Sequence, residues 1–202
     1  MSQAELPPNT FEPDCRAGWR AWLEVHHAAG RGIWLVLRKK AAPVHNLSLD
    51  EAVEEALCFG WIDSKPRKLD DTRSLLYFAP RKPGSGWSAV NKARVARVQA
   101  AGRMTPAGQA KIDAAIRDGS WTRLDAVDAL EVPPDLAAAL AGEPGARAGW
   151  DAFPPSARRG ILEWVAGAKT PPTREKRVRE TATLAARGER ANAWPPPGKR
   201  RA

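Results

Sequence analysis

Hydrophobic residues near the start of the chain first follow the spacing of a helix and then that of a strand. Four residues recur at the i, i+3, i+4, i+7 positions of an amphipathic helix: Trp19, Trp22, Leu23 and His26. Pro13 and Asp14 suit the first turn of this helix, and Gly30 ends it. The uninterrupted apolar run at 33–37 then predicts a buried strand.

The pattern returns to helix spacing after residue 47. Ser48 followed by Glu51 is typical of a capping box, which marks a helix start. Four apolar residues are expected on the inner face of this helix: Leu49, Val53, Ala56 and Leu57. Gly60 ends the helix, and the adjacent carboxylates Glu54 and Glu55 are expected on its solvent-exposed surface.

Two extended segments, beginning at Trp61 and covering 72–79, predict a β-hairpin. Pro80 and Pro83 cannot continue a central strand, so the chain leaves the sheet through the loop 80–86. A helix is expected to start near Trp87 or Ser88 and run to Ala101. The pair Thr105-Pro106 predicts the next helix start, with an end before Gly119.

The composition becomes acidic, alanine-rich and interrupted by prolines after Trp121. Helices are expected at 134–141, at 155–168 and from Thr170-Pro171 to about Arg187. We therefore predict an α+β fold, with a small antiparallel or mixed sheet and flanking helices, followed by a C-terminal helical region. The expected division is an α/β module at 1–125, a helical module at 126–190 packed on the first, and a flexible basic tail at 191–202.

Positive charge is concentrated in two segments of this 202-residue chain, whose net charge is +9. Residues 64–103 hold ten Lys and Arg against two Asp (+8), and residues 171–202 hold nine against three Glu (+6), so the rest carries −5. Such segregation favours anionic partners, although a basic segment is equally often only a solvated face.

No apolar run approaches the roughly 20 residues of a membrane-spanning helix, so no membrane span is expected. The start of the sequence lacks the features of a signal peptide, which predicts a cytoplasmic protein. Cys15 and Cys58 fall in apolar patterns and are expected to be small buried side chains and not a disulfide. No metal site and no cofactor are predicted, and the oligomeric state stays open.

Aromatic and polar residues gather around the predicted hairpin and its loop. Trp61, Asp63 and Lys65 alternate along a strand start, while Trp87 and Asn91 are one helical turn apart. The full candidate ligand-binding set is Trp61, Asp63, Lys65, Arg81, Ser85, Trp87, Ser88 and Asn91. Arginine, exposed backbone N–H groups and a helix start favour an anion, and tryptophans would wall the site.

Structural roles are the alternative for each of these residues taken alone. Trp61 and Trp87 would then be core residues, Asp63 would pair with Arg81, and Asn91 would hydrogen-bond buried backbone. No catalytic triad and no phosphate-binding motif can be assembled from the spacing. A helix-end bond to a carbonyl is the expected role of His27.

Several stretches together resemble the YdeI/OmpD-associated family, also called the bacteriocin-protection family. They include "EALCFGWIDS", "APRKPGSGWSAVNKARV" and "PPSARRGILEWVAGAKTPPTREKRV", and the resemblance runs from about Cys15 to Gly188. The first two are taken as the most specific. The resemblance implies a link to antimicrobial-peptide or stress tolerance and to an outer-membrane porin.

Three hypotheses follow for the function. We favour a cytoplasmic binding protein that holds a small anionic or polar ligand in the pocket described above. The second hypothesis is an enzyme with Asp63 as acid or base and Arg81 as anion clamp. The third is a nucleic-acid or anionic-surface binder that uses the basic segment 64–103 and the C-terminal helix.

Overall fold

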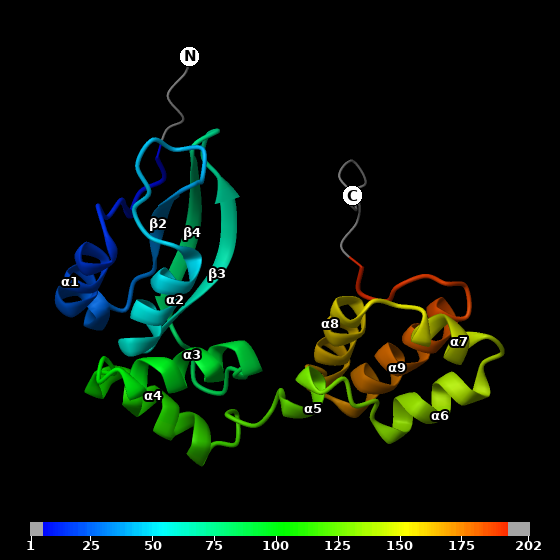
Figure 1. The fold of residues 1–202 in the computed structure, drawn as a ribbon. Coiled ribbons are helices and arrows are strands. Elements are labelled where there is room, and N and C mark those ends of the chain that lie inside the picture. The colour runs from blue at the N-terminus through cyan, green and yellow to red at the C-terminus, as the bar shows by residue number, and fades with distance from the viewer. Residues whose placement is uncertain (1–5, 194–202) are drawn as a thin grey trace. The chain divides into compact units, whose positions relative to one another are not determined.

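The computed structural model describes residues 6–193 of the chain. The chain forms two compact units, Met1–Thr122 and Arg123–Ala202 (Figure 1). Each unit has its own hydrophobic core. Within the described residues, no helix is both long enough and apolar enough to cross a membrane.

A four-stranded mixed sheet forms the centre of the first unit, in the order β1-β2-β4-β3. β2 (Ile33–Arg38) pairs antiparallel with β4 (Arg73–Pro80), which pairs antiparallel with β3 (Trp61–Lys68). The predicted buried strand and hairpin are therefore confirmed. The short β1 (Thr10–Phe11), which was not predicted, runs parallel to β2 and makes the sheet mixed.

Helices α1 (Arg16–His26) and α2 (Leu49–Cys58) bury their apolar faces with the sheet in one core. Trp19 and Leu57 are fully buried there, and the Trp19 indole N–H donates to the carbonyl of Ala52 at 3.0 Å. The short 3-10 helix η1 (His27–Ala29) follows α1 and ends at Gly30, as predicted. The capping box at Ser48 and Glu51 is present.

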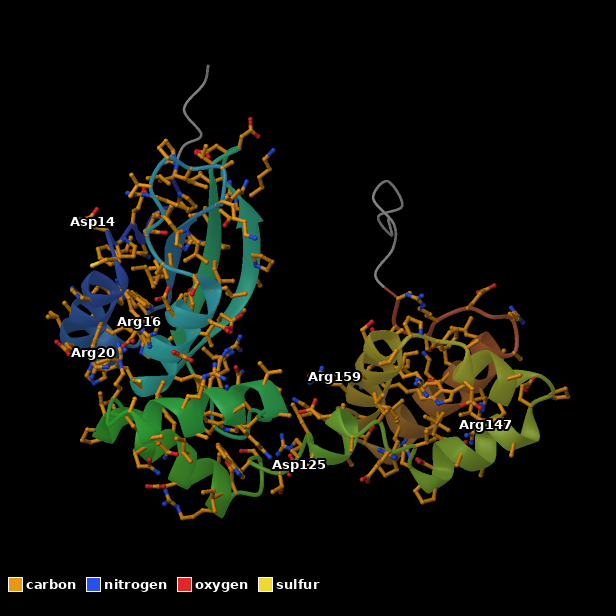
Figure 2. The ribbon with its side chains drawn as sticks, in the orientation of Figure 1. Asp14, Arg16, Arg20, Asp125, Arg147 and Arg159 are labelled. Atoms are coloured by element: carbon orange, nitrogen blue, oxygen red, sulfur yellow. The ribbon has the colours of Figure 1, made fainter. Side chains whose placement is uncertain are left out.

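Two expectations for α2 were wrong. Leu49 is exposed, because it is the first helical residue and lies outside the packed turns. Glu55 is completely buried and is not a surface carboxylate. Its oxygens accept from Arg16 at 2.6 Å, from Arg20 at 3.0 Å and from Arg103. Figure 2 shows Arg16 and Arg20 projecting from α1 beside α2. Three guanidinium groups thus compensate the burial of this carboxylate.

Helices α3 (Ala89–Ala100) and α4 (Pro106–Arg117) complete the first unit. Ser88 and Thr105 cap them, each accepting a hydrogen bond from a backbone N–H three residues later. The helix expected to start at Trp87 or Ser88 therefore starts at Ala89. Both helices lie at the end of the sheet where β4 leaves it (Figure 1).

The second unit is helical throughout its described part, as predicted. Its helices are α5 (Asp125–Asp128), α6 (Pro134–Gly142), α7 (Ala146–Asp151), α8 (Pro155–Ala166) and α9 (Pro171–Ala185). The short helices α5 and α7 were not predicted. α9 packs against α6, α7 and α8. The close approach of α9 to α7 depends on Gly149, because an added Cβ at this position would lie 1.9 Å from the carbonyl oxygen of Ala185.

Ile161 and Val165 of α8 are buried inside the second unit's own core. The helical module therefore does not need to pack on the first module to remove these apolar residues from water. The predicted packing of the two modules stays a prediction. Ala191 is also buried in this core. Most of the predicted flexible tail, 194–202, lies outside the described residues.

Cys58 is buried as expected, but Cys15 is exposed. The expectation for Cys15 was wrong because this residue is the N-cap of α1 and precedes the helix's packed face. Burial, and the nearby charge of Glu55, raise the pKa of the Cys58 thiol.

Candidate functional site

The loop between β4 and α3 is fixed at both ends. Pro80 ends β4, and the backbone N–H of Arg81 donates to the carbonyl of Gly60 at 2.9 Å. Ser85 Oγ donates to the carbonyl of Lys82 at 2.8 Å, which closes the turn around Gly84. Gly84 has φ +69°, a left-handed conformation that glycine adopts without strain. The loop therefore has a defined shape between the sheet and α3.

Arg81 is the buried cation of this loop, with 5% of its surface exposed. Its guanidinium carbon lies 3.8 Å from the centroid of the Trp87 ring, and Nη2 donates to the carbonyl of Gly86 at 2.7 Å. Burial lowers the pKa of Arg81 to about 10, and the charge of Asp63 opposes this lowering. Among the described residues, no carboxylate lies within ion-pair distance of Arg81. The positive charge is therefore buried without a direct counter-ion.

A cavity of about 60 Å³ lies against Arg81 within the first unit. The loop side is lined by Arg81, Lys82, Pro83, Gly84, Ser85 and Trp87. The opposite side comes from α4 and the turn after it, through Lys111, Ala114, Ala115, Asp118 and Ser120. Three cationic side chains thus line the cavity together with one carboxylate. Asp118 is exposed to solvent, which screens its charge more than that of buried Arg81.

Ser120 supplies an unsatisfied polar atom to this cavity. It is buried, and its Oγ has no hydrogen-bond partner among the described residues. Its backbone N–H donates to Asp118 Oδ1 at 2.9 Å, which fixes the turn after α4. A buried hydroxyl without a partner is costly, so a polar ligand in the cavity would satisfy it.

Three of the eight predicted site residues line this cavity: Arg81, Ser85 and Trp87. Trp61 is a core residue whose indole N–H donates to the carbonyl of His27 at 3.0 Å. Lys65 is exposed on β3. Asp63, at the start of β3, acts on the site only through its charge on Arg81.

Ser88 and Asn91 have structural partners. Ser88 caps α3, and Asn91 Oδ1 accepts from Arg94 Nη1 at 2.8 Å. The expectation that Trp87 and Asn91 lie one helical turn apart was wrong, because Trp87 precedes Ser88, the N-cap of α3. His27 Nδ1 lies 2.9 Å from the carbonyl oxygen of Leu23, which confirms its expected helix-end role.

The sequence did not indicate Lys111, Asp118 or Ser120, which come from α4 and the turn after it, far along the chain from the loop. The available signal was a pair of glycines that permit close packing of α4. A Cβ on Gly108 would lie 2.2 Å from the carbonyl oxygen of Cys58, and a Cβ on Gly60 would lie 2.6 Å from Lys111 Cγ. Only glycine at these positions lets α4 approach the end of α2 closely enough to place Lys111 at the cavity.

Comparison with known proteins divides the chain into two matched regions. Residues 11–111, half of the chain, match a domain of unknown function (DUF8412). Residues 129–188 match the family described as bacteriocin-protection, YdeI or OmpD-associated. No significant match was found among the curated proteins or the solved structures.

The two regions correct the extent of the resemblance drawn from the sequence. The stretches at 55–64 and 79–95, taken as the most specific, fall in the first region, whereas the bacteriocin-protection match lies in the helical unit. The chain therefore belongs to the DUF8412 domain family through its first unit, and its second unit carries a region that matches the bacteriocin-protection, YdeI or OmpD-associated family model.

Proposed function

We propose that this chain is a binding protein that holds a small oxyanion in the cavity beside Arg81. One observation carries the proposal, namely a guanidinium that is 95% buried with no carboxylate at ion-pair distance among the described residues. Burying a charge without a counter-ion is unfavourable, and strongly perturbed charged groups in cavities are typical of functional sites. An anion would supply the missing charge.

The cavity's size restricts the ligand class. Sites for whole metabolites usually enclose about 300–1,000 Å³. At about 60 Å³, this cavity has room for an inorganic oxyanion or for the carboxylate or phosphate group of a larger molecule. The ligand's oxygens would accept from Arg81, whose planar fork carries five N–H donors, and from the hydroxyl of Ser120. Lys82 and Lys111 would add positive charge at the cavity's rim.

Calorimetric titration with inorganic phosphate and with sulfate, at constant ionic strength, tests this proposal. Either anion should bind saturably to the wild-type chain, and Arg81→Met should abolish the binding. Lys65→Met is the matched control, because it removes an exposed cation of the same unit that does not line the cavity. No saturable binding of either anion, or equal loss in both variants, would overturn the proposal.

The cellular part of the proposal is a cytoplasmic role in tolerance of antimicrobial peptides or other stress. It is supported by the family's description as bacteriocin-protection and by the exposed free thiol of Cys15, which suits a reducing compartment. Cells expressing the wild-type chain should survive a bacteriocin better than cells expressing Arg81→Met at equal protein level. Equal survival of the two kinds of cells would show that the anion site is not needed for tolerance.

A further inference from the structure

A cavity of the helical unit lies along one face of α9 and has a volume of about 660 Å³. Four of its residues repeat on one face of that helix at three- and four-residue spacing: Thr173, Lys176, Arg177 and Glu180. Trp164 of α8 borders the cavity from the neighbouring helix, and Arg190 and Asn192 border it from the segment after α9. All of these residues belong to the second unit.

The cations of this cavity differ from their neighbours on α9. Arg174 is paired with Asp135, and Arg179 is paired with Glu175. By contrast, Lys176 and Arg190 have no ion-pair partner within residues 6–193. With Arg177, they give the cavity three positive charges against the single carboxylate of Glu180.

Trp164 and Arg177 form a prepared flat surface at the same cavity. The Arg177 guanidinium lies 4.9 Å from the centroid of the Trp164 ring, and Nη1 donates to the Trp164 carbonyl. This hydrogen bond holds the guanidinium plane in place, so its orientation does not have to be fixed when a ligand binds. Indole and guanidinium surfaces both stack on planar aromatic rings.

We infer that this cavity binds a small molecule that combines a planar aromatic ring with a phosphate group, such as a nucleoside monophosphate. The ring would stack on Trp164 or the Arg177 plane, and the phosphate would lie near Lys176 and Arg190. A cavity of about 660 Å³ falls in the range usual for such ligands. This site is separate from the Arg81 cavity and does not depend on the function proposed for it.

Titration with adenosine 5′-monophosphate tests the inference, with adenosine and inorganic phosphate as separate arms. The indole N–H resonance of Trp164, identified by its absence in Trp164→Phe, should shift on adding the nucleotide. Adenosine alone and phosphate alone should each bind this site at least about tenfold more weakly, because each makes half of the contacts. No shift of the Trp164 resonance would overturn the inference.

Charge variants decide whether the cavity's cations carry the binding. Lys176→Gln should weaken nucleotide binding about tenfold, whereas Lys169→Gln, an exposed lysine of the same unit outside the cavity, should not. Arg81→Met should leave the nucleotide-induced shift of the Trp164 resonance unchanged, which distinguishes this site from the oxyanion cavity. If both lysine variants weakened nucleotide binding equally, the effect would come from net charge alone, and the assignment of this site would be overturned.

Discussion

Replacing Arg81 by methionine should change the stability of the free protein little while removing its response to anions. Methionine retains an unbranched apolar chain in the same space, so the substitution mainly removes the guanidinium. Three terms decide the result: the burial of the charge, the hydrogen bond to Gly86 and the contact with Trp87. Because Arg81 is almost completely buried, solvent screening does not erase these terms.

The free energy that the variant regains by removing the buried charge nearly cancels the free energy that it loses with the two contacts of the guanidinium. Lowering the pKa of Arg81 to about 10 corresponds to about 3 kcal/mol against the charged form in the folded state, and the variant regains this amount. It loses a charge-assisted hydrogen bond worth about 1.5–3 kcal/mol and a cation–π contact worth up to about 2 kcal/mol. The net cost should therefore be no more than about 2 kcal/mol.

The pH dependence of this difference has a defined sign. Below about pH 10 the guanidinium is charged in both the folded and the unfolded chain, so the stability difference between wild type and Arg81→Met should not vary between pH 6 and 9. As pH rises through about 10, the folded chain releases the proton first. Burial then costs less, and the wild type gains stability relative to the variant.

Hydrogen exchange of the amides in the β2–β4 ladder is the suitable assay, because it reports the first unit's stability separately from that of the second. In the absence of anion, the two proteins should differ by at most about 2 kcal/mol, and saturating phosphate should protect only the wild type. A loss above about 4 kcal/mol without ligand would show that Arg81 is primarily structural. Equal protection of both proteins by phosphate would refute the site.

Two further predictions concern the cores of the two units. Glu55→Gln should destabilise the first unit by about 3–5 kcal/mol in the same exchange assay, because it leaves three arginines without their shared buried carboxylate. The control is Glu24→Gln, which removes the charge of an exposed ion pair and should cost less than about 1 kcal/mol. Gly149→Ala should lower the melting temperature of the second unit by several degrees, because the added Cβ would overlap the backbone of α9. The control is Gly160→Ala, which has open space around the added Cβ and should leave the melting temperature unchanged or raise it. A tolerated Gly149→Ala, or a Glu55→Gln as mild as its control, would contradict the packing described.

Local sequence signals identified most of the elements correctly. The capping boundaries at Ser48, Thr105 and Thr170 were predictable because a cap hydrogen bond joins residues three positions apart. The strand β1 and the helices α5 and α7 were missed because they are short. An element of two to six residues shows too little periodicity to be recognised.

The candidate site was only partly predictable for a different reason. Arg81, Ser85 and Trp87 lie within one loop, so the sequence places them together. Lys111 and Ser120 reach the same cavity through the packing of α4, which no local pattern encodes. The same limit explains the misassignment of Glu55, whose arginine partners at positions 16, 20 and 103 are brought together only by the tertiary fold.

The contrast between Glu55 and Arg81 argues for a role of Arg81 beyond stability. Both side chains are almost completely buried in the same unit, and both carry a charge. The fold surrounds Glu55 with three guanidinium groups, which shows that this unit can provide counter-ions where only burial has to be offset. At Arg81 it provides two carbonyl oxygens, an aromatic face and a cavity lined by two further cations. The two lysines beside Arg81 raise the electrostatic cost of its charge, and the one carboxylate that lines the cavity, Asp118, is exposed to solvent, so an anion in the cavity would offset that cost.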